Sequence, residues 1–335
     1  MCKREIHMGL GWPLERKGFD REGLPVLTTQ KSTWLRRSLF YDQWNIGLVA
    51  FAGASLVRGA KLPDVRWLPH QRSGIFVADP FFVNWGGRQL ILCEVYDYRL
   101  GRGRIGAISL DSQSTLEIVL DLPVHAAFPF PIKYQGKLYC IPETVGLEEV
   151  AIYDISDLSR PTKAGVLLDD VAGCDCAVMR FAGRWWMFGT DARDGPFDKL
   201  RIWYADDLLG RWRPHPMNPV KVDLASSRSA GAPFLSEGVL YRPAQDCSTG
   251  YGSRVVIHRV VRLTPTEFEE QPVTIIKPDD DGPYPDGLHT LSLAPELTLI
   301  DGKRVRSVFL SWPVLTRRVE SLGKLVQSSL NAWMR

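Results

Sequence analysis

Residues 79–94 read DPFFVNWGGRQLILCE: an apolar run, a Gly-Gly pair and a second apolar run, with a carboxylate at each end. Two short apolar runs joined by two turn residues predict a β-hairpin. Aligned without gaps on the turn glycine, this stretch matches FPFPIKYQGKLYCIPE (128–143) and DCAVMRFAGRWWMFGT (175–190). The turn glycines are then Gly87, Gly136 and Gly183, at separations of 49 and 47 residues. A period of this length predicts a fold built from repeated units.

Two further copies extend the repeat toward the C-terminus. A weaker fourth copy, AGAPFLSEGVLYRPAQ (230–245), turns at Gly238, and a divergent fifth, residues 289–310, is expected to turn at Asp301-Gly302. A more polar strand is predicted after several hairpins, and another before several of them. These strands are residues 103–111, 116–122, 149–156, 164–170 and 199–207. Four strands in each of five repeats predict an all-β fold, a five-bladed β-propeller, with residues 43–51 recruited to close the ring.

The repeat and its flanks divide the chain into three parts. We expect an N-terminal extension over residues 1–40, the propeller over 41–313 and a short C-terminal amphipathic helix over 314–335. The helix is predicted because apolar residues recur three and four positions apart, and Pro313 fits just before its start. The recurring residues are Leu315, Val319, Leu322, Val326, Leu330 and Trp333.

Composition narrows the class of protein. Of 335 residues, 45% are hydrophobic and 24% charged, and the net charge is only +3, so neither disorder nor a nucleic-acid partner is predicted. No secretory signal is visible, and the longest uncharged apolar stretch, 44–57, is too short to cross a bilayer, so a cytoplasmic protein is expected. The six cysteines form no metal-ligand pattern. They are expected to be reduced thiols, and no metal or cofactor is predicted.

The start of each repeated hairpin is expected to face the propeller axis. Asp79, Phe128, Asp175 and Ala230 are equivalent positions there, as are Glu94, Glu143, Thr190 and Gln245 at the other end. Several ionisable groups in one concavity predict a binding or catalytic site. The candidate residues are Asp79, Glu94, His125, Glu143, Asp175, Arg228, Gln245, Asp246 and His289.

Structural roles for the same residues stay open. An Asp before Pro is often a turn cap, and Glu94 or Glu143 could be a solvated strand end. His125 and His289 could be satisfied structural histidines, and Arg228 and Gln245 could make surface pairs.

Three stretches carry a resemblance to a known family. ADPFF (78–82) with GGRQLILCE (86–94), AVMRFAGRWWMFGTD (177–191) and IWYADDLLGRWRPHPMNPV (202–220) resemble the five-bladed propellers of glycoside hydrolase family 43. The resemblance implies that Asp79 is the general base and that Asp175 tunes the acid.

A closer resemblance covers about residues 43–312. DQWNIG (42–47), RSAGAPF (228–234), LYRPAQDCSTGYGSRVVIHRV (240–260) and GLHTLS (287–292), together with the hairpins above, resemble the N-terminal domain of glucosamine inositolphosphorylceramide transferases, which has stand-alone bacterial relatives. This resemblance implies the propeller fold and a place in polysaccharide or glycolipid metabolism. The resemblance also implies that the transferase chemistry of the plant enzymes resides in a separate domain, for which we expect no counterpart in this sequence.

The departure from the hydrolase pattern concerns the proton donor. The hydrolases place a Glu before Gly-Pro on a later blade, whereas residues 228–233 read RSAGAP and hold Arg228 instead. A relocated acid would be Glu143 as first candidate and Glu94 as second.

Two functions follow from these residues. One is a glycosidase-like or sugar-transferring enzyme with Asp79, Asp175 and Glu143 as catalytic residues and the remaining candidates on substrate. The other is a non-catalytic module that binds a glycan or nucleotide sugar. Aromatic residues are expected to stack on the sugar in either case, with Trp85, Phe128, Trp186 and Tyr251 as candidates.

The C-terminal segment suggests a second partner. Its apolar stripe is flanked by four basic residues and by Glu320, which suggests weak contact of residues 314–335 with a membrane surface; packing across the outer face of the propeller is the alternative. The basic residues are Arg317, Arg318, Lys324 and Arg335.

Overall fold

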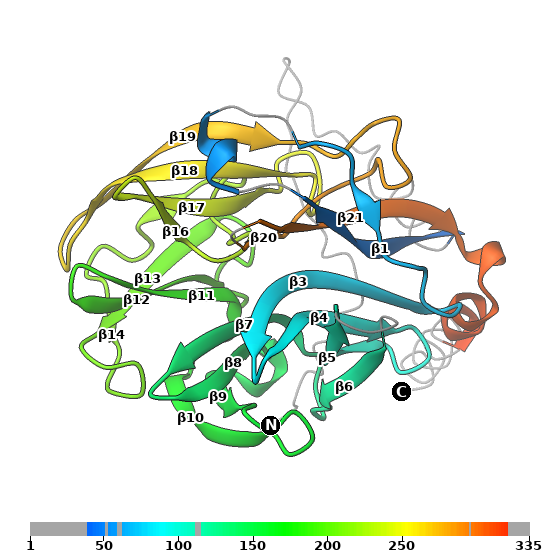
Figure 1. Cartoon of the computed structure of the whole chain (residues 1–335), viewed down its shortest axis with the longest axis horizontal. Coiled ribbons are helices and arrows are strands. Elements are labelled where there is room, and N and C mark those ends of the chain that lie inside the picture. The colour runs from blue at the N-terminus through cyan, green and yellow to red at the C-terminus, as the bar shows by residue number, and fades with distance from the viewer. Residues whose placement is uncertain (1–38, 51–52, 59–61, 111–114, 295, 321–335) are drawn as a thin grey trace, which may run out of the picture.

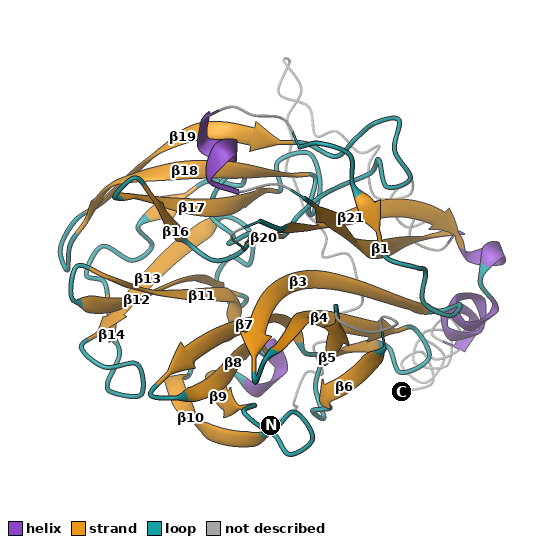
Figure 2. Ribbon diagram, viewed as in Figure 1, coloured by secondary structure: helices purple, strands orange, loops and turns teal. Residues whose placement is uncertain are grey.

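The computed structural model describes residues 39–50, 53–58, 62–110, 115–294 and 296–320. This part of the chain forms five antiparallel sheets around a ring, with β3, β7, β11 and β20 nearest its centre (Figure 1). Figure 2 shows how strongly strands outweigh helices. The predicted all-β, five-bladed propeller is therefore confirmed.

Each sheet is one blade, and its strands follow one another from the centre outward. The first blade is β3 (Ile75–Trp85), β4 (Arg88–Asp97), β5 (Arg102–Ser109) and β6 (Leu116–Leu120). The second is β7 (Ala127–Tyr134), β8 (Lys137–Glu143), β9 (Glu149–Asp154) and β10 (Thr162–Asp169). The third is β11 (Gly173–Phe181), β12 (Arg184–Asp191), β13 (Lys199–Ala205) and β14 (Arg213–Pro214), with β15 (Lys221–Val222) also paired to β13. The fourth is β16 (Phe234–Ser236), β17 (Val239–Asp246), β18 (Arg254–Leu263) and β19 (Phe268–Ile276).

The fifth blade joins the two ends of the ring. It is β20 (Leu291–Leu293), β21 (Thr298–Ser307), β1 (Phe40–Val49) and β2 (Arg66–Trp67). Strand β1 pairs with β21 without interruption from Phe40 opposite Ser307 to Val49 opposite Thr298. The segment that was expected to close the ring therefore does so as the third strand of the last blade.

The hairpin turns of the first four blades lie where the repeat places them. Both turn residues have positive φ in every case, which is the conformation of the tight hairpin turns that suit twisted strands. The turns are Gly86-Gly87, Gln135-Gly136, Ala182-Gly183 and Glu237-Gly238.

The fifth hairpin does not turn at Asp301-Gly302, so that prediction is wrong. Its turn lies between β20 and β21, where the Ala294 N–H donates to the Leu297 carbonyl at 2.8 Å. Both Asp301 and Gly302 lie inside β21, opposite Ile46 and Asn45 of β1. Gly302 serves close packing, because a Cβ there would lie 2.3 Å from the Trp67 ring. An Asp-Gly pair is a strong turn signal, but this glycine makes room for an indole.

The hydrophobic core lies between neighbouring blades. One cluster joins Phe188 of β12 to Leu240 of β17, and another joins Ile300 of β21 to Val255 of β18. Because both faces of an inner strand pack on a neighbouring blade, β4 is buried from Leu90 to Asp97 without alternation. This burial holds the inner ends of the strands in place.

Short helices connect or follow the blades. In the described ranges, three are 3₁₀ helices: η1 (Gly53–Arg58), η2 (Val145–Leu147) and η3 (Val308–Leu310). An α-helix then covers residues 312–320, so that Pro313 lies in its first turn. Val314 is buried against a cluster that includes Tyr96 and Tyr98, while Val319 is 59% exposed. The remaining residues of the predicted helix, 321–335, and most of the predicted extension, 1–38, lie outside the described residues.

Two further features bear on the expectations from sequence. Among the described residues, no helix is both long enough and apolar enough to span a bilayer. Five cysteines are described, and all are buried free thiols: Cys93, Cys140, Cys174, Cys176 and Cys247.

Candidate functional site

Three innermost strands contain the same backbone irregularity. Asp79, Phe128 and Asp175 have φ of 51°, 43° and 45°, and the pairing register shifts beside each one. A residue other than glycine rarely adopts this conformation, which is strained by roughly 1–3 kcal/mol. The three positions that the repeat made equivalent are therefore one β-bulge at the inner end of three blades.

A carboxylate holds each of these bulges. The Asp79 N–H donates to Asp301 Oδ2 at 3.2 Å, the Phe128 N–H to Asp79 Oδ2 at 3.0 Å, and the Asp175 N–H to Glu143 Oε2 at 3.1 Å. Each acceptor lies on the preceding blade in the ring or, for Asp301, on the blade that closes it. The acidic side chains thus satisfy buried N–H groups that leave the regular sheet pairing.

The second strand of every blade carries a buried polar residue beside this centre. Glu94 and Glu143 pair with Ala78 and Ala127, just before the bulges, and Asp301 occupies the corresponding place in the fifth blade. The full set is Glu94, Glu143, Thr190, Gln245 and Asp301. Asp301 was missed in the sequence because its Asp-Gly pair was assigned to a turn.

Asp79 is buried and surrounded by hydrogen-bond donors. Besides the Phe128 N–H, it accepts from Thr290 Oγ1 at 2.7 Å, and His289 Nε2 lies 3.6 Å from its Oδ1. Burial raises the pKa of Asp79 to about 6, although the neighbouring His289 opposes the increase. Near neutral pH this carboxyl group can therefore both accept and release a proton.

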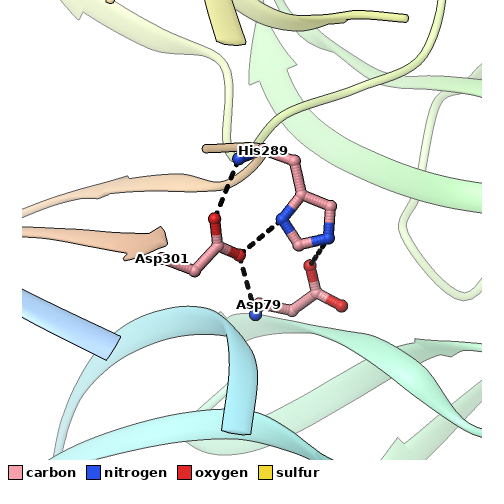
Figure 3. Close-up of side chains that lie close together, drawn as sticks. All are labelled: Asp79, His289 and Asp301. Atoms are coloured by element: carbon pink, nitrogen blue, oxygen red, sulfur yellow. Dashed lines mark hydrogen bonds and ion pairs between the residues drawn. The ribbon is translucent and has the colours of Figure 1, made fainter. Parts of the chain in front are cut away.

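His289 lies between two carboxylates (Figure 3). Its Nδ1 lies 2.6 Å from Asp301 Oδ2, and its backbone N–H donates to Asp301 Oδ1 at 2.9 Å. The ring stacks on Trp44 with centroids 4.0 Å apart. Burial lowers the pKa of His289, but Asp301 and Asp79 outweigh it and the net pKa is raised. A protonated imidazole stacked on an indole also gains a cation–π interaction.

Arg228 joins the carboxylates of the second and third blades. Its Nε donates to Asp175 Oδ2 at 2.6 Å and its Nη2 to Glu143 Oε2 at 2.9 Å. The guanidinium also lies 5.4 Å from the centroid of the Phe197 ring and 5.5 Å from that of Tyr251. Arg228 is therefore buried at the centre and makes no surface pair.

Asp175 has a second donor. Gln245 Nε2 lies 2.7 Å from Asp175 Oδ2, and the same amide nitrogen donates to the Ser229 carbonyl. Burial raises the pKa of Asp175 to about 7; Arg228 opposes this and Glu143 adds to it.

Glu94 and His125 form a separate pair at the first blade. His125 Nε2 lies 3.7 Å from Glu94 Oε1, and His125 Nδ1 accepts from the Gly103 N–H at 2.8 Å. Burial, followed by the charges of Arg228 and Arg102, lowers the pKa of His125 to about 4. Burial and four neighbouring carboxylates raise the pKa of Glu94 well above its usual value.

One group of side chains at this centre has the ligand types of a metal site. Among the described residues, Asp79, His289 and Asp301 could hold a metal ion, since their ligand atoms all lie within 4.8 Å of one another. Both ring nitrogens of His289, however, face carboxylate oxygens, and Asp79 and Asp301 also accept from Thr290 and from backbone N–H groups. The donors and acceptors match one another, so we assign the three residues to a hydrogen-bonded ion cluster.

Of the other predicted residues, some lie at the acidic centre and others lie away from it. Asp246 is held locally, because it accepts from Ser248 and from Arg254 Nε at 2.7 Å. Of the aromatic candidates, Tyr251 lies at the centre, 5.2 Å from the His289 ring. Phe128 and Trp186 are buried in the cores between blades, and Trp85 donates its indole N–H to the Ser156 carbonyl.

Two residues of the centre gave no usable signal in the sequence. Thr290 precedes a short inner strand, and Trp44 belongs to the closing strand β1, outside the repeated hairpins.

Comparisons with known proteins agree with this architecture. A family model described as glucosamine inositolphosphorylceramide transferase 1, N-terminal, matches residues 69–282. A glucosamine inositolphosphorylceramide transferase 1 from Oryza sativa subsp. japonica is 34% identical over 209 residues, which are 60% of this chain and 28% of the relative. The chain thus spans less than a third of the length of the curated relative that it matches.

Solved structures share the fold at low sequence identity. A family 117 glycoside hydrolase from the marine bacterium Zobellia galactanivorans aligns with a TM-score of 0.50 and 14% identity, over 78% of this chain and 90% of that one. A putative glycoside hydrolase from Bacteroides ovatus ATCC 8483 aligns with a TM-score of 0.52 and 13% identity, over 72% of this chain and 88% of that one.

Proposed function

Because the chain belongs to the family of glucosamine inositolphosphorylceramide transferase 1 N-terminal domains, we propose that it binds a saccharide at the inner ends of its blades and processes a glycosidic bond there. The name of the family supports a sugar-containing ligand. The fold shared with glycoside hydrolases is compatible with such a site but does not assign one.

The observation that carries the proposal is the concentration of ionisable groups around the bulges. Five buried carboxylates surround Arg228 and His289, and the pKa values of Asp79 and Asp175 are raised to about 6 and about 7. Groups tuned toward neutral pH in one place are typical of catalytic and binding sites. The carboxylates are Asp79, Glu94, Glu143, Asp175 and Asp301.

The charge of the cluster favours one class of ligand. Five acidic side chains meet at the centre, whereas Arg228 and His289 are already paired with carboxylates and Lys303 donates to the Tyr251 carbonyl. Such a site repels the diphosphate of a nucleotide sugar but suits neutral hydroxyl groups, which both donate and accept hydrogen bonds. We therefore propose a saccharide or glycoside as the ligand, rather than a nucleotide sugar.

Within this proposal, Asp79 acts as the base and Asp175 sets the charge of the centre. Gln245 and Arg228 would orient sugar hydroxyls beside Asp175. Glu143, the first candidate for the acid, is poorly suited to donate a proton, because its Oε2 already accepts from both Arg228 and the Asp175 N–H.

Because the Glu143 oxygen is already occupied by these two donors, a second candidate function is also favoured, a module that binds a saccharide without turnover. The two functions share the ligand and differ in whether product forms.

Calorimetry with hexoses, hexosamines, disaccharides and a UDP-hexose, on the full chain, tests the binding. We expect at least one saccharide to bind, and Asp79→Asn to weaken that binding about tenfold or more, because hydrogen bonds to a charged group contribute about 1.5–3 kcal/mol. Asp157→Asn is the matched control, since Asp157 lies in an exposed turn of the second blade.

Two outcomes would contradict the proposed function. One is that no saccharide binds the wild-type chain. The other is that Asp79→Asn, with an unchanged circular dichroism spectrum, binds as tightly as wild type. A cytoplasmic location and weak membrane contact through residues 314–335 remain predictions.

A further inference from the structure

Glu94 differs from the other acidic residues of the centre in its hydrogen bonding. Its side chain is 8% exposed, and its Oε1 is fully buried without a hydrogen-bond partner. Asp79, Glu143, Asp175 and Asp301, in contrast, each accept from at least one donor near the axis. Among the residues that the structure describes, no arginine or lysine lies within ion-pair distance of Glu94.

The space around Glu94 is kept open by a glycine. A Cβ at position 103 would lie 2.4 Å from Glu94 Oε1 and 2.6 Å from the Ala126 carbonyl oxygen. Any larger residue there would displace the carboxyl group. Gly103 also supplies the N–H that fixes the neighbouring imidazole.

His125 lies beside the same carboxyl group. Its Nδ1 accepts from the Gly103 N–H at 2.8 Å, so in the neutral ring the proton must be on Nε2. That nitrogen lies 3.7 Å from Glu94 Oε1, the oxygen without a partner, which is longer than a hydrogen bond. A small movement on ligand binding would bring Nε2–H into contact with Oε1 and leave the acid proton on Oε2.

The charges that face Glu94 are mostly negative. Burial and these carboxylates favour its protonated form. They come from four other strands, and the facing groups are Asp79 on β3, Glu143 on β8, Asp175 on β11 and Asp301 on β21, with neutral His125 and Tyr96 beside them.

We propose that Glu94 is the proton donor of this site and that His125 is its positioning residue. The inference rests on the proposed function, because it names the acid that acts opposite Asp79. Glu143, whose Oε2 already accepts from Arg228 and from the Asp175 N–H, is not that acid.

The proposed step is the hydrolysis of a glycoside. Glu94 gives its proton to the glycosidic oxygen as the bond from that oxygen to the anomeric carbon breaks, and the bonding electrons go to the leaving oxygen. A water molecule attacks the anomeric carbon, and Asp79 takes the proton that the water loses. The products are the free sugar and the free alcohol. Proton exchange with solvent returns Asp79 to its ionised form and Glu94 to its acid form.

A first experiment measures protonation without any ligand. Infrared spectra of the full chain labelled with ¹³C-glutamate report the carbonyl band of a protonated glutamic acid. We expect this band at pH 7 in the wild type and its loss in Glu94→Gln. The exposed Glu117 on β6 provides the matched control, Glu117→Gln, which should keep the band. A wild-type spectrum without the band, or an unchanged spectrum in Glu94→Gln, overturns the proposal.

A second experiment measures turnover of aryl and alkyl glycosides by the full chain. We expect Glu94→Gln to lower the rate about 10²- to 10⁴-fold on alkyl glycosides, which need a proton donor. Dinitrophenyl glycosides need none, so their rate should be nearly unchanged. We expect His125→Ala to shift the apparent pKa of the proton donor in the pH profile of kcat on alkyl glycosides. If His125 had only a structural role, its loss would lower the rate by the same factor at all pH values.

The outcomes separate this inference from the proposed function. If Glu94→Gln loses equal activity on both glycoside classes, or if the wild type binds saccharide but turns over no glycoside, Glu94 is not the donor and the binding function stands. If no saccharide binds although the carbonyl band is present, the proposed function fails and the protonated state of Glu94 stands.

Discussion

Arg228 is the residue that compensates the acidic centre. It donates to Asp175, Glu143 and the Pro196 carbonyl and is only 7% exposed. Buried ion pairs contribute little compared with apolar packing, but removal of one partner leaves a charge without compensation. The ion pairs of Arg228 therefore contribute less to the free energy of unfolding than the removal of Arg228 alone would cost.

We expect Arg228→Met to destabilise the protein by about 3–5 kcal/mol at pH 8. In the folded protein the pKa of Asp175 is raised to about 7, and Arg228 holds it below what burial alone would give. The folded state therefore binds more protons than the unfolded state from about pH 4 to pH 7, and protonated Asp175 no longer needs a cation. The loss in the free energy of unfolding of Arg228→Met relative to wild type, measured by urea unfolding, should therefore be smaller at pH 5 than at pH 8.

Arg213→Met is the matched control. Arg213 is half exposed and pairs with the exposed Asp206 at 3.2 Å, so its loss should cost less than about 1 kcal/mol at either pH. Equal costs for the two variants would show that Arg228 does not compensate the buried carboxylates.

At the scale of elements, a second buried ion pair lies within the fourth blade, and a lysine connects it to the third. Arg242 of β17 binds Glu270 of β19 through two hydrogen bonds of 2.8 and 2.6 Å, and Lys221 of β15 donates to the same carboxylate at 3.0 Å. Arg242 is fully buried. Strand β15 pairs with the third blade, so this carboxylate links two sheets.

We expect Glu270→Gln to destabilise the protein by about 3–5 kcal/mol near pH 7, because Arg242 would stay buried without its counter-charge. Although burial alone raises it, Arg242 lowers the pKa of Glu270 to about 2. A lowered pKa contributes stability above the unfolded value, which is lost as pH falls toward 2. The deficit of the variant should therefore shrink from pH 7 to pH 3 in denaturant unfolding.

Glu267→Gln should change stability by less than about 1 kcal/mol, since Glu267 and its partner Arg262 are both more than half exposed. A deficit of Glu270→Gln that stayed constant with pH would argue against a charge effect.

The elements also show what sequence reasoning could and could not reach. The gapless repeat located four hairpins, because a glycine ends each of their turns, and it placed Asp79 and Asp175 on one structural position. The turn of the fifth hairpin, residues 294–297, contains no glycine, so the Asp-Gly pair inside β21 was taken for the turn and Asp301 was missed.

Roles at the centre depended on contacts that spacing does not encode. Glu94 and Glu143 occupy equivalent positions in their blades, and only the residues that surround each of them in the fold distinguish the two. Arg228 approaches Glu143 from a position 85 residues away in the sequence, whereas Glu94 has a glycine and a histidine beside it.

At the scale of the whole molecule, ring closure by β1 makes the propeller a cooperative unit. Strand β1 pairs with β21 along its whole length, and neighbouring blades share buried clusters. Opening of the fifth blade would therefore expose both its hydrogen bonds and the adjoining cores.

Hydrogen exchange tests this cooperativity. We expect the amides of β1 and β21 to exchange with an opening free energy within about 1 kcal/mol of that of β4, because all three should open only in global unfolding. Exchange of β1 at a much lower free energy, with β4 still protected, would mean that the closing blade opens by itself.

The chain of carboxylates that hold the bulges has a consequence for how such a protein can change over evolutionary time. Asp301 supports Asp79, Asp79 supports Phe128, and Glu143 supports Asp175, so each acidic side chain stabilises the backbone of another blade. A substitution at one of these acidic positions, made to alter ligand preference, also removes the hydrogen bond that holds a strained bulge of another blade. New specificities at this centre are therefore accessible mainly through paired substitutions, or through residues such as Tyr251 that lie beside the acidic chain without belonging to it.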